Sequence, residues 1–254
     1  MAFRENELVY AEDSSGKRHW FRMSGGMIKI PSLGTLDGGR LMDSEDGSAF
    51  SLAGEEFFLF RPGVTELMDS LDRGAQIITP KDAASILLNC DVKCGDTVLE
   101  VGAGSGGLTT ALLHATACSG KVVTVELKEE NAKITRRNVS RSGWKERWEC
   151  VMGDAKSVSL DLTADVLTMD MPDPWLALDN LLPHLRSGGR ICIYVPNMNQ
   201  MESSVLALRE RGFAGVRAVE NIQRGMDVHP GGVRPAYEML SHTGYLIFGR
   251  KRTF

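Results

Sequence analysis

The fold of this chain is decided by the stretch Thr97-Val-Leu-Glu-Val-Gly102-Ala-Gly104-Ser-Gly106-Gly107-Leu-Thr-Thr-Ala-Leu-Leu113. It has the pattern of an apolar strand, a glycine turn and the first turns of a helix. Glycines allow the backbone to approach a ligand closely, and the start of a helix offers free N–H donors. The same spacing satisfies G-x-G-x-x-G, so a dinucleotide site remains an alternative at this point.

Around this stretch, helical segments alternate with short apolar segments from Asp82 to the end of the chain. Such alternation is typical of βαβ units, so we predict an α/β fold with a mostly parallel sheet. The expected strands are Thr97–Val101, Lys121–Glu126, Trp148–Met152, Asp165–Met169, Arg190–Val195 and Gly244–Gly249.

The composition changes near residue 70. Residues 1–70 have a net charge of −5 and many glycines, whereas residues 71–254 have a net charge of +1. The first part contains short strand-like segments, so we predict a small β-barrel or sheet over 1–70 and an α/β domain over 71–254. The expected N-terminal strands are Glu7–Ala11, His19–Met23, Met27–Ile30 and Phe57–Phe60.

The composition excludes several protein classes. With 254 residues, of which 43% are hydrophobic and 24% charged, the chain can form a packed core. Its apolar runs are too short for a membrane helix and its start is polar, so we expect a cytoplasmic protein. The net charge of −4 gives no support for nucleic-acid binding. Five scattered cysteines argue against disulfides and zinc, and we predict buried thiols and no metal site.

Carboxylates occur at the ends of the expected strands. Glu126 ends the second strand, 19 residues beyond Gly107, where it can hold two ribose hydroxyls. With Glu100, Asp154 and Asp170, it is expected along the crevice where open α/β sheets bind ligands. Four carboxylates and a glycine loop suit a ligand with an amine, a ribose and an adenine but no phosphate, as in S-adenosylmethionine. The alternative is that these residues are helix caps or surface charges.

The fourth expected strand runs into Asp170-Met-Pro172-Asp173-Pro174-Trp175. Each proline restricts its own backbone and that of the residue before it, so this segment is expected to form a rigid ledge for a planar base. A purely structural turn is the alternative. The basic helix expected over Glu129–Arg141 is interpreted as a solvated face, with polyanion binding as its alternative.

Five motifs together give the chain a resemblance to the tRNA adenine-N1 methyltransferase family, in particular to its bacterial and archaeal single-gene members. They cover most of the chain, and those outside the glycine loop are the more specific. The motifs are Gln76-Ile-Ile-Thr-Pro80-Lys81-Asp82, Glu100-Val-Gly-Ala-Gly-Ser-Gly-Gly107, Asp170-Met-Pro-Asp-Pro-Trp175, Tyr194-Val-Pro-Asn197-Met-Asn-Gln200 and the tail Arg234-Pro followed by Ser241-His242-Thr243-Gly244-Tyr245.

The resemblance implies a small N-terminal β-barrel-like domain, a class I Rossmann-like methyltransferase domain with a seven-stranded sheet, and a homotetramer. It implies transfer of a methyl group from S-adenosylmethionine to N1 of adenine 58 in the T-loop of tRNA, with Asp170 as catalytic residue at the target base. The implied cofactor-binding residues are Ile78, Gly102, Gly104, Ser105, Gly106, Gly107, Glu126, Asp154, Ala155 and Asp170.

Two positions depart from the family pattern. Thr79 occupies the place where many members have an aromatic residue, and Asn131 the place where some relatives have a basic one. Three other readings remain open: a protein-carboxyl methyltransferase, a non-catalytic RNA-binding subunit and an NAD-dependent oxidoreductase. The β-rich first part and the Asp170–Trp175 segment argue against the first, and the intact cofactor motifs argue against the second.

Overall fold

The computed structural model describes residues 2–30, 33–72, 74, 76–117 and 119–253. These divide into two compact units, one formed by 1–70 with Arg141–Gly143 and the other by 71–140 with 144–254. Each unit has its own hydrophobic core.

The first unit is built from short strands and two short helices. Its four-stranded antiparallel sheet has the order β2-β1-β6-β5, and β3 pairs with β4 as a separate ribbon. Phe57, Met23 and Leu59 are fully buried in its core. The elements are β1 (Leu8–Asp13), β2 (Arg18–Arg22), β3 (Met27–Ile30), β4 (Gly34–Asp37), α1 (Gly39–Met42), β5 (Ala49–Leu52), β6 (Glu55–Phe60) and α2 (Val64–Asp69).

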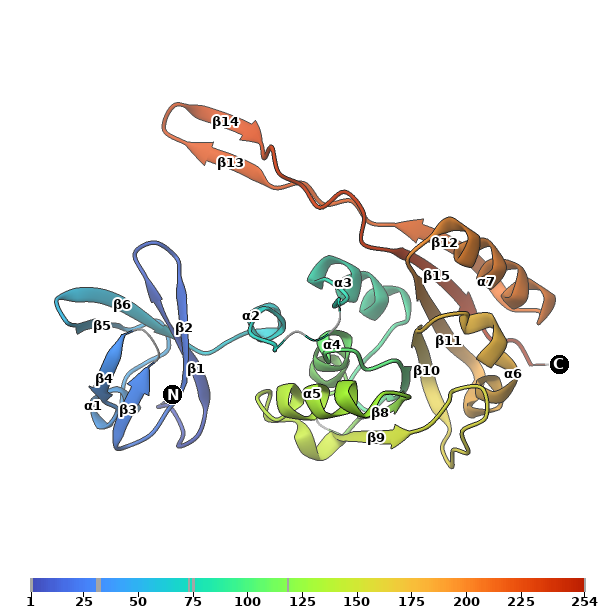
Figure 1. Cartoon of the computed structure of the whole chain (residues 1–254), viewed down its shortest axis with the longest axis horizontal. Helices are drawn as coiled ribbons and strands as arrows, with labels where there is room; N and C mark the ends of the chain where they lie inside the picture. Colours follow the sequence, from blue (N-terminus) through green and yellow to red (C-terminus); the bar gives the residue numbers. More distant parts are fainter. Residues whose placement is uncertain (1, 31–32, 73, 75, 118, 254) are drawn as a thin grey trace. The chain divides into compact units, whose positions relative to one another are not determined.

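The second unit contains a seven-stranded sheet in the order β12-β15-β11-β10-β7-β8-β9 (Figure 1). Its strands from β11 to β9 are parallel, while β15 is antiparallel to both its neighbours. The elements are α3 (Pro80–Asn89), β7 (Thr97–Val101), α4 (Gly107–Ala115), β8 (Lys121–Glu126), α5 (Glu129–Val139), β9 (Trp148–Met152), β10 (Ala164–Asp170), α6 (Leu178–Leu181), β11 (Leu185–Val195), α7 (Met198–Glu210), β12 (Ala214–Glu220), β13 (Met226–His229), β14 (Gly232–Pro235) and β15 (Tyr245–Arg250), with short 3-10 turns at Lys145–Arg147, Pro174–Ala177 and Leu182–His184.

Helices cover both faces of this sheet, with α3, α4 and α5 on one face and α6 and α7 on the other (Figure 1). Successive strand residues point to opposite faces, so Leu99 and Leu167 pack toward α6 and α7. Glu100 points the other way, toward Thr109 of α4. Because both faces are covered, the central strands are almost continuously apolar, which is why the sequence predicted them.

The predicted α/β class with a mostly parallel seven-stranded sheet is confirmed, and so is an N-terminal part rich in short strands, which form a four-stranded antiparallel sheet and a separate ribbon. Five strands lay outside the prediction: β4, β5, β12, β13 and β14. Their residues are exposed or half-buried apart from Leu36, so they lack the apolar pattern that reveals a strand.

The interpretation of all cysteines as buried thiols was wrong for two of them. Cys94 is exposed in the turn between α3 and β7, and Cys150 is half-buried on the edge strand β9. Cys90 and Cys192 are buried, and Cys118 lies outside the described residues. None of the helices in the described part of the chain has the length and apolar character that crossing a membrane requires.

Candidate active site

The glycine loop joins β7 to α4 and needs glycine for steric reasons. Gly102 has φ of +89°, and a Cβ at this position would collide with the backbone carbonyl of Asp170. Its N–H donates to the carbonyl of Val125 at 2.9 Å, so the loop is held between β8 and β10. Gly106, with φ of +80°, is the residue from which α4 begins. The loop therefore places backbone atoms that no side chain covers at the carboxyl ends of the strands.

Glu126 fastens this loop from the end of β8. Its Oε2 accepts hydrogen bonds from the N–H groups of Ala103 at 2.9 Å and Gly104 at 3.4 Å, and its Oε1 accepts one from Lys128 at 2.8 Å. A carboxylate has about four lone-pair sites, so it retains capacity for a ligand hydroxyl. Glu126 thus shapes the loop in addition to facing the cavity.

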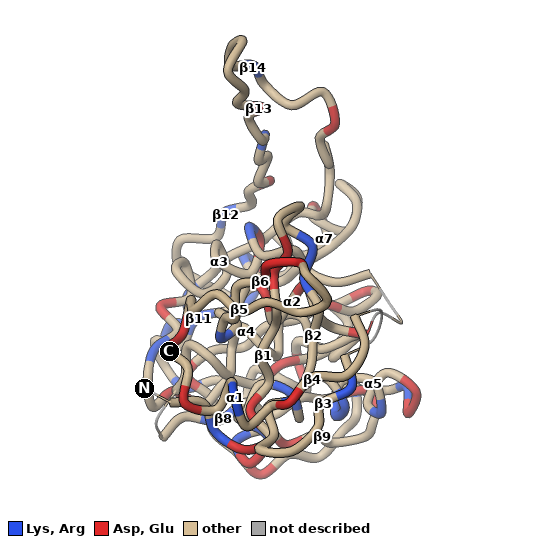
Figure 2. Tube along the Cα trace, turned by 90° about the vertical axis from the view of Figure 1, so that its left-hand side faces the viewer, with Lys and Arg blue, Asp and Glu red and all other residues tan. Residues whose placement is uncertain are grey.

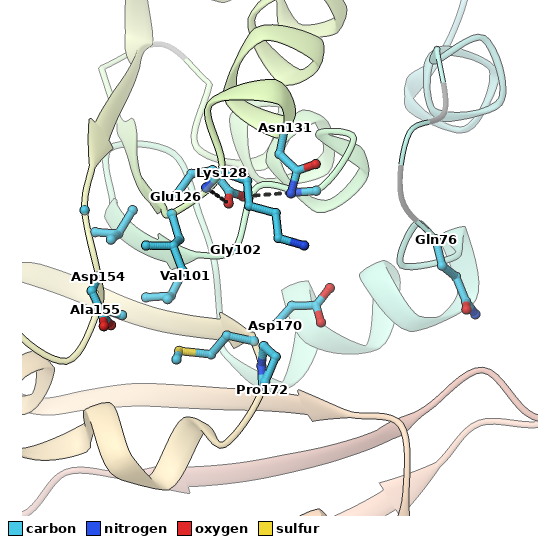
Figure 3. A pocket seen from close by; sticks show the side chains of 15 residues that line it. Gln76, Val101, Gly102, Glu126, Lys128, Asn131, Asp154, Ala155, Asp170 and Pro172 are labelled. Carbon is cyan, nitrogen blue, oxygen red and sulfur yellow. Dashed lines mark hydrogen bonds between the residues drawn. The ribbon is translucent and has the colours of Figure 1, made fainter.

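A cavity of about 400 Å³ lies at this edge, between the ends of β7, β8, β9 and β10. Figure 3 shows Glu126 and Lys128 on one side of it and Asp170 and Pro172 on the other. Six predicted residues line it together: Gly102, Gly104, Glu126, Asp154, Ala155 and Asp170.

Four other predicted residues, Ile78, Ser105, Gly106 and Gly107, are not among those that line the cavity. Ile78 is buried, with its carbonyl next to Gly107. Ser105 is buried as well, and its Oγ accepts a hydrogen bond from the N–H of Gly74 at 3.0 Å. Ile78 packs against the loop at Gly107, and Ser105 ties the loop to the segment before α3.

Several residues that line the cavity were not among the predicted cofactor-binding residues. Most directly follow or precede a strand-end carboxylate, so the strand boundaries contained the signal that could have found them. These residues are Gln76, Val101, Val125, Leu127, Lys128, Asn131, Gly153, Met171 and Pro172.

Comparison with known proteins places the chain among methyltransferases. A family model described as the tRNA methyltransferase complex GCD14 subunit matches residues 61–232, which is more than half of the chain. The chain belongs to the tRNA adenine-N1 methyltransferase family. The resemblance seen in the motifs is therefore confirmed.

Individual relatives agree with this family. The chain is 30% identical to a tRNA (adenine(57)-N(1)/adenine(58)-N(1))-methyltransferase, TrmI, of Methanocaldococcus jannaschii, over 94% of this chain and 93% of that protein. Two solved structures are similar: the tRNA (m1A58) methyltransferase TrmI of Aquifex aeolicus (25% identity, TM-score 0.80, all of both chains) and an S-adenosylmethionine-dependent O-methyltransferase of Thermotoga maritima (27% identity, TM-score 0.87, 100% of this chain and 96% of that one).

Asp170 ends β10 with its side chain in the cavity. Desolvation by the surrounding protein, followed by the negative charge of Glu126, raises the pKa of Asp170 to about 7. A cation in the cavity would favour its ionised form, since opposite charges lower the pKa of a carboxyl group. The fraction of Asp170 that is ionised therefore depends on the charge of the ligand in the cavity.

The expectation that Glu100 lies along the crevice was wrong. Its side chain is buried below α4, where Oε2 accepts hydrogen bonds from the hydroxyls of Thr109 and Thr124, both at 2.7 Å. Its Oε1 has no hydrogen-bond partner among the described residues. Burial raises the pKa of Glu100 to about 7, more than the two hydroxyls lower it. Glu100 ties β7, β8 and α4 together around the loop.

Three motifs that the sequence left unconnected meet in the second unit, those that contain Lys81, Tyr194 and Thr243. Lys81 Nζ contacts both carboxylate oxygens of Asp82 at 3.0 Å and donates to the Thr243 hydroxyl at 2.6 Å. Thr79, where many family members have an aromatic residue, donates its hydroxyl to Asp82 at 3.0 Å. Thr243 in turn accepts, through its carbonyl, a hydrogen bond from the Tyr194 hydroxyl. These motifs form a buried polar network.

Proposed function

We propose that this protein is an S-adenosylmethionine-dependent tRNA methyltransferase that acts on N1 of adenine 58 in the T-loop. The observation that carries this proposal is the position of Asp170, whose carboxylate reaches the cavity beside the glycine loop. Family membership and the names of the M. jannaschii and A. aeolicus relatives support this substrate.

The residues around the cavity fit this cofactor. Gly102 and Gly104 allow the backbone to approach it, and the volume of about 400 Å³ suits a small molecule. Glu126, Asp154 and Asp170 favour a ligand with cationic groups and disfavour the phosphates of NAD. We assign the ribose hydroxyls to Glu126 and the adenine ring to Asp154 and its neighbour Ala155.

The cofactor, when bound, supplies a methyl group on a positively charged sulfur. Asp170 then has two tasks. Its carboxylate accepts a hydrogen bond from the exocyclic amine of the target adenine, which directs N1 toward the methyl group. It also stabilises the positive charge that develops on the ring as N1 attacks. Both tasks need the ionised carboxylate, and neither needs a covalent bond to the protein.

The substrate base must leave the RNA stack to reach this cavity, because an enzyme cannot reach the target atom of a base that is stacked within folded RNA. We interpret Pro172, which lines the cavity directly after Asp170 and Met171, as part of the surface against which the flipped base rests. The proline ring is rigid, and it also restricts the backbone conformation of Met171 before it. Little conformational entropy is therefore lost when a base binds against this surface.

We further propose that 71–254 is the methyltransferase domain and 1–70 the small domain, and that the protein is a cytoplasmic homotetramer. A single chain of net charge −4 offers tRNA little attraction. Association of copies would bring basic segments such as 133–147 and 250–252 together. The ammonium of Lys251 already donates to the carbonyls of Leu182 and Leu185, so this residue contributes little to such a surface.

The decisive experiment is incubation of the protein with unmodified tRNA transcripts and S-adenosylmethionine, followed by mapping of methylated adenines by mass spectrometry. We expect 1-methyladenine at position 58. A transcript with guanine at that position is the control and should remain unmethylated there. Methylation at another base, or none with a cofactor-loaded protein, would contradict the proposal.

A second candidate function is methyl transfer to an oxygen atom, because the similar Thermotoga maritima structure is described as an O-methyltransferase. The acceptor that we consider is a protein carboxylate, as in the protein-carboxyl methyltransferases. It is tested in parallel with acidic peptides, including isoaspartyl peptides. Methyl ester formation that exceeds tRNA methylation in rate would favour it. Cofactor binding without transfer to either substrate would favour the non-catalytic subunit.

A further inference from the structure

The helix α5 has a buried face that is partly polar. Its charged residues are all exposed, and Figure 2 shows such positions along the helix. The buried positions are Ala132, Thr135, Asn138 and Val139, so two of these four carry polar side chains. Thr135 is 0% and Asn138 1% exposed. Because burying a hydroxyl or an amide without a partner is costly, both side chains are expected to bond to a neighbouring element.

Asn138 makes its hydrogen bonds to two separate parts of the second unit. Its Oδ1 accepts from the N–H of Asp72 at 3.1 Å, and its Nδ2 donates to the carbonyl of the same residue at 2.9 Å. Asp72 belongs to the entry segment, which is residues 71–79, described except for 73 and 75. Nδ2 also donates to the carbonyl of Ser105 in the glycine loop at 2.8 Å. Both amide hydrogens are therefore used, one on the entry segment and one on the loop.

Further contacts join the same three parts. The N–H of Gly74 in the entry segment donates to the Oγ of Ser105 at 3.0 Å, and the Thr135 hydroxyl donates to the carbonyl of Gly104 at 3.3 Å. A Cβ at Gly106 would lie 3.0 Å from a methyl carbon of Thr135, so α5 and the loop also pack closely. The entry segment, the loop and α5 thus form one bonded group.

Both partners of Asn138 continue into walls of the cavity. Gln76, four residues after Asp72, lines the cavity, and Figure 3 shows it apart from the lining residues at the strand ends. Gly104, directly before Ser105, lines the cavity as well, whereas Asn138 does not. Within its described residues the entry segment contains no helix or strand, so it depends on bonds of this kind for its order.

We propose that Asn138 is a positioning residue for S-adenosylmethionine, the cofactor of the proposed function on which this role depends. Asn138 acts without touching the cofactor, because it holds the glycine loop and the entry segment in the arrangement that the cofactor binds. A cavity with ordered walls loses less conformational entropy when a ligand binds. Without the amide, the free protein would populate loosened walls, and the apparent affinity would fall with the fraction of molecules that are ready to bind.

The test compares Asn138→Leu with the wild type. Leucine keeps the branched shape of the side chain but makes none of the three hydrogen bonds. In calorimetry without tRNA, the Kd for S-adenosylmethionine should rise roughly tenfold, because buried backbone groups lose their partner. Hydrogen exchange measured by mass spectrometry should be faster in residues 71–79 of the free variant, and the cofactor should restore protection there. At saturating cofactor, kcat should stay within about twofold of wild type, so that the loss appears in KM.

Thr116→Val is the matched control. Thr116 is 0% exposed at the opposite end of α4 from the loop, and its hydroxyl donates to the carbonyl of Leu112 at 2.9 Å. This variant should melt at a lower temperature, as Asn138→Leu should, but it should keep its Kd and the exchange of 71–79. A second test variant, Ser105→Ala, removes the acceptor of the Gly74 N–H and leaves the backbone carbonyl that Asn138 binds. It should raise both Kd and exchange by a smaller factor, and it keeps the proposal testable if Asn138→Leu does not fold.

An unchanged Kd in the folded test variants would overturn the proposal, and so would an equal loss of affinity in Thr116→Val. A fall in kcat at saturating cofactor with a normal Kd would contradict it too, since Asn138 would then act on the chemical step. A wild type that binds no S-adenosylmethionine would remove the proposed function itself. A normal wild-type Kd that none of the variants changes would remove only the role of Asn138.

Discussion

Replacing Asp170 by asparagine tests the chemistry of the site directly. Asparagine keeps the size of the side chain and an oxygen that accepts a hydrogen bond, but it removes the negative charge. If that charge stabilises the methylated adenine as it forms, the rate of methyl transfer falls while tRNA and cofactor still bind. The loss of one preorganised electrostatic group costs roughly 10²-fold in turnover. We expect an effect of that size or larger.

The pKa of Asp170 adds a pH dependence to this prediction. With a pKa of about 7 in the free protein, half of the carboxyl groups are ionised at pH 7. At pH 6 only about one tenth of them are ionised. The ratio kcat/KM for the cofactor depends on the ionisation of groups in the free enzyme, so it should fall about fivefold between pH 7 and pH 6. The cationic cofactor, once bound, favours the ionised carboxylate of Asp170. The pH at which kcat falls to half of its maximum should therefore be lower than the corresponding pH for kcat/KM. The asparagine variant should lack both ionisations.

Single-turnover methyl transfer to a tRNA transcript, with protein and cofactor in excess, is the appropriate assay because product release does not limit it. Asp173→Asn is the matched control. This substitution removes a carboxylate from the same turn, but Asp173 does not line the cavity. Asp173 has a φ of +51°, a conformation that asparagine adopts readily. This control should react at close to the wild-type rate.

A folded, cofactor-saturated Asp170→Asn protein with a rate within a few-fold of wild type would refute the catalytic assignment. The alternative, in which Asp170 only shapes the turn before Pro172, predicts a lower melting temperature and nearly normal activity per folded molecule. Equal losses in Asp170→Asn and Asp173→Asn would likewise contradict the argument, since they would point to a general electrostatic effect of the turn.

Three further predictions concern the loop and its supports. Glu126→Ala should weaken S-adenosylmethionine binding by about 1–3 kcal/mol in calorimetry, because charge-assisted hydrogen bonds are lost, and an unchanged affinity would contradict this. The raised pKa of Glu100, about 7, means that the folded protein binds this proton more tightly than the unfolded chain. The free energy of unfolding should therefore fall by roughly 3 kcal/mol between pH 4 and 8 from this group alone, and denaturant titrations of Glu100→Gln should show a smaller decrease than wild type. Gly102→Ala should lose cofactor affinity and stability because its Cβ meets the Asp170 carbonyl, whereas Gly143→Ala, at φ of +76° with nothing within 4 Å, should keep its affinity.

The sequence alone was sufficient for the centre of the second unit. The segments expected for β7, β8 and β9 agree with the observed strands residue for residue. The strands β7 and β8 are parallel and covered on both faces, so they are apolar along most of their length, whereas β9 is a half-exposed edge strand. The carboxylates of Glu126, Asp154 and Asp170 could be assigned to one crevice by the rule that ligands bind at the carboxyl ends of such strands. All three do line one cavity.

Only the tertiary structure decided the position of Glu100 and the polar network around Asp82. Glu100 is one residue from the strand end, and its direction depends on hydroxyls from α4 and β8 that no local pattern connects to it. Asp82 and Thr243 are 161 residues apart and meet at 2.6 Å. Local patterns record which face of a strand or helix is apolar. The partner of a buried polar group depends instead on how distant elements pack, since the large majority of such groups are hydrogen-bonded in the folded protein.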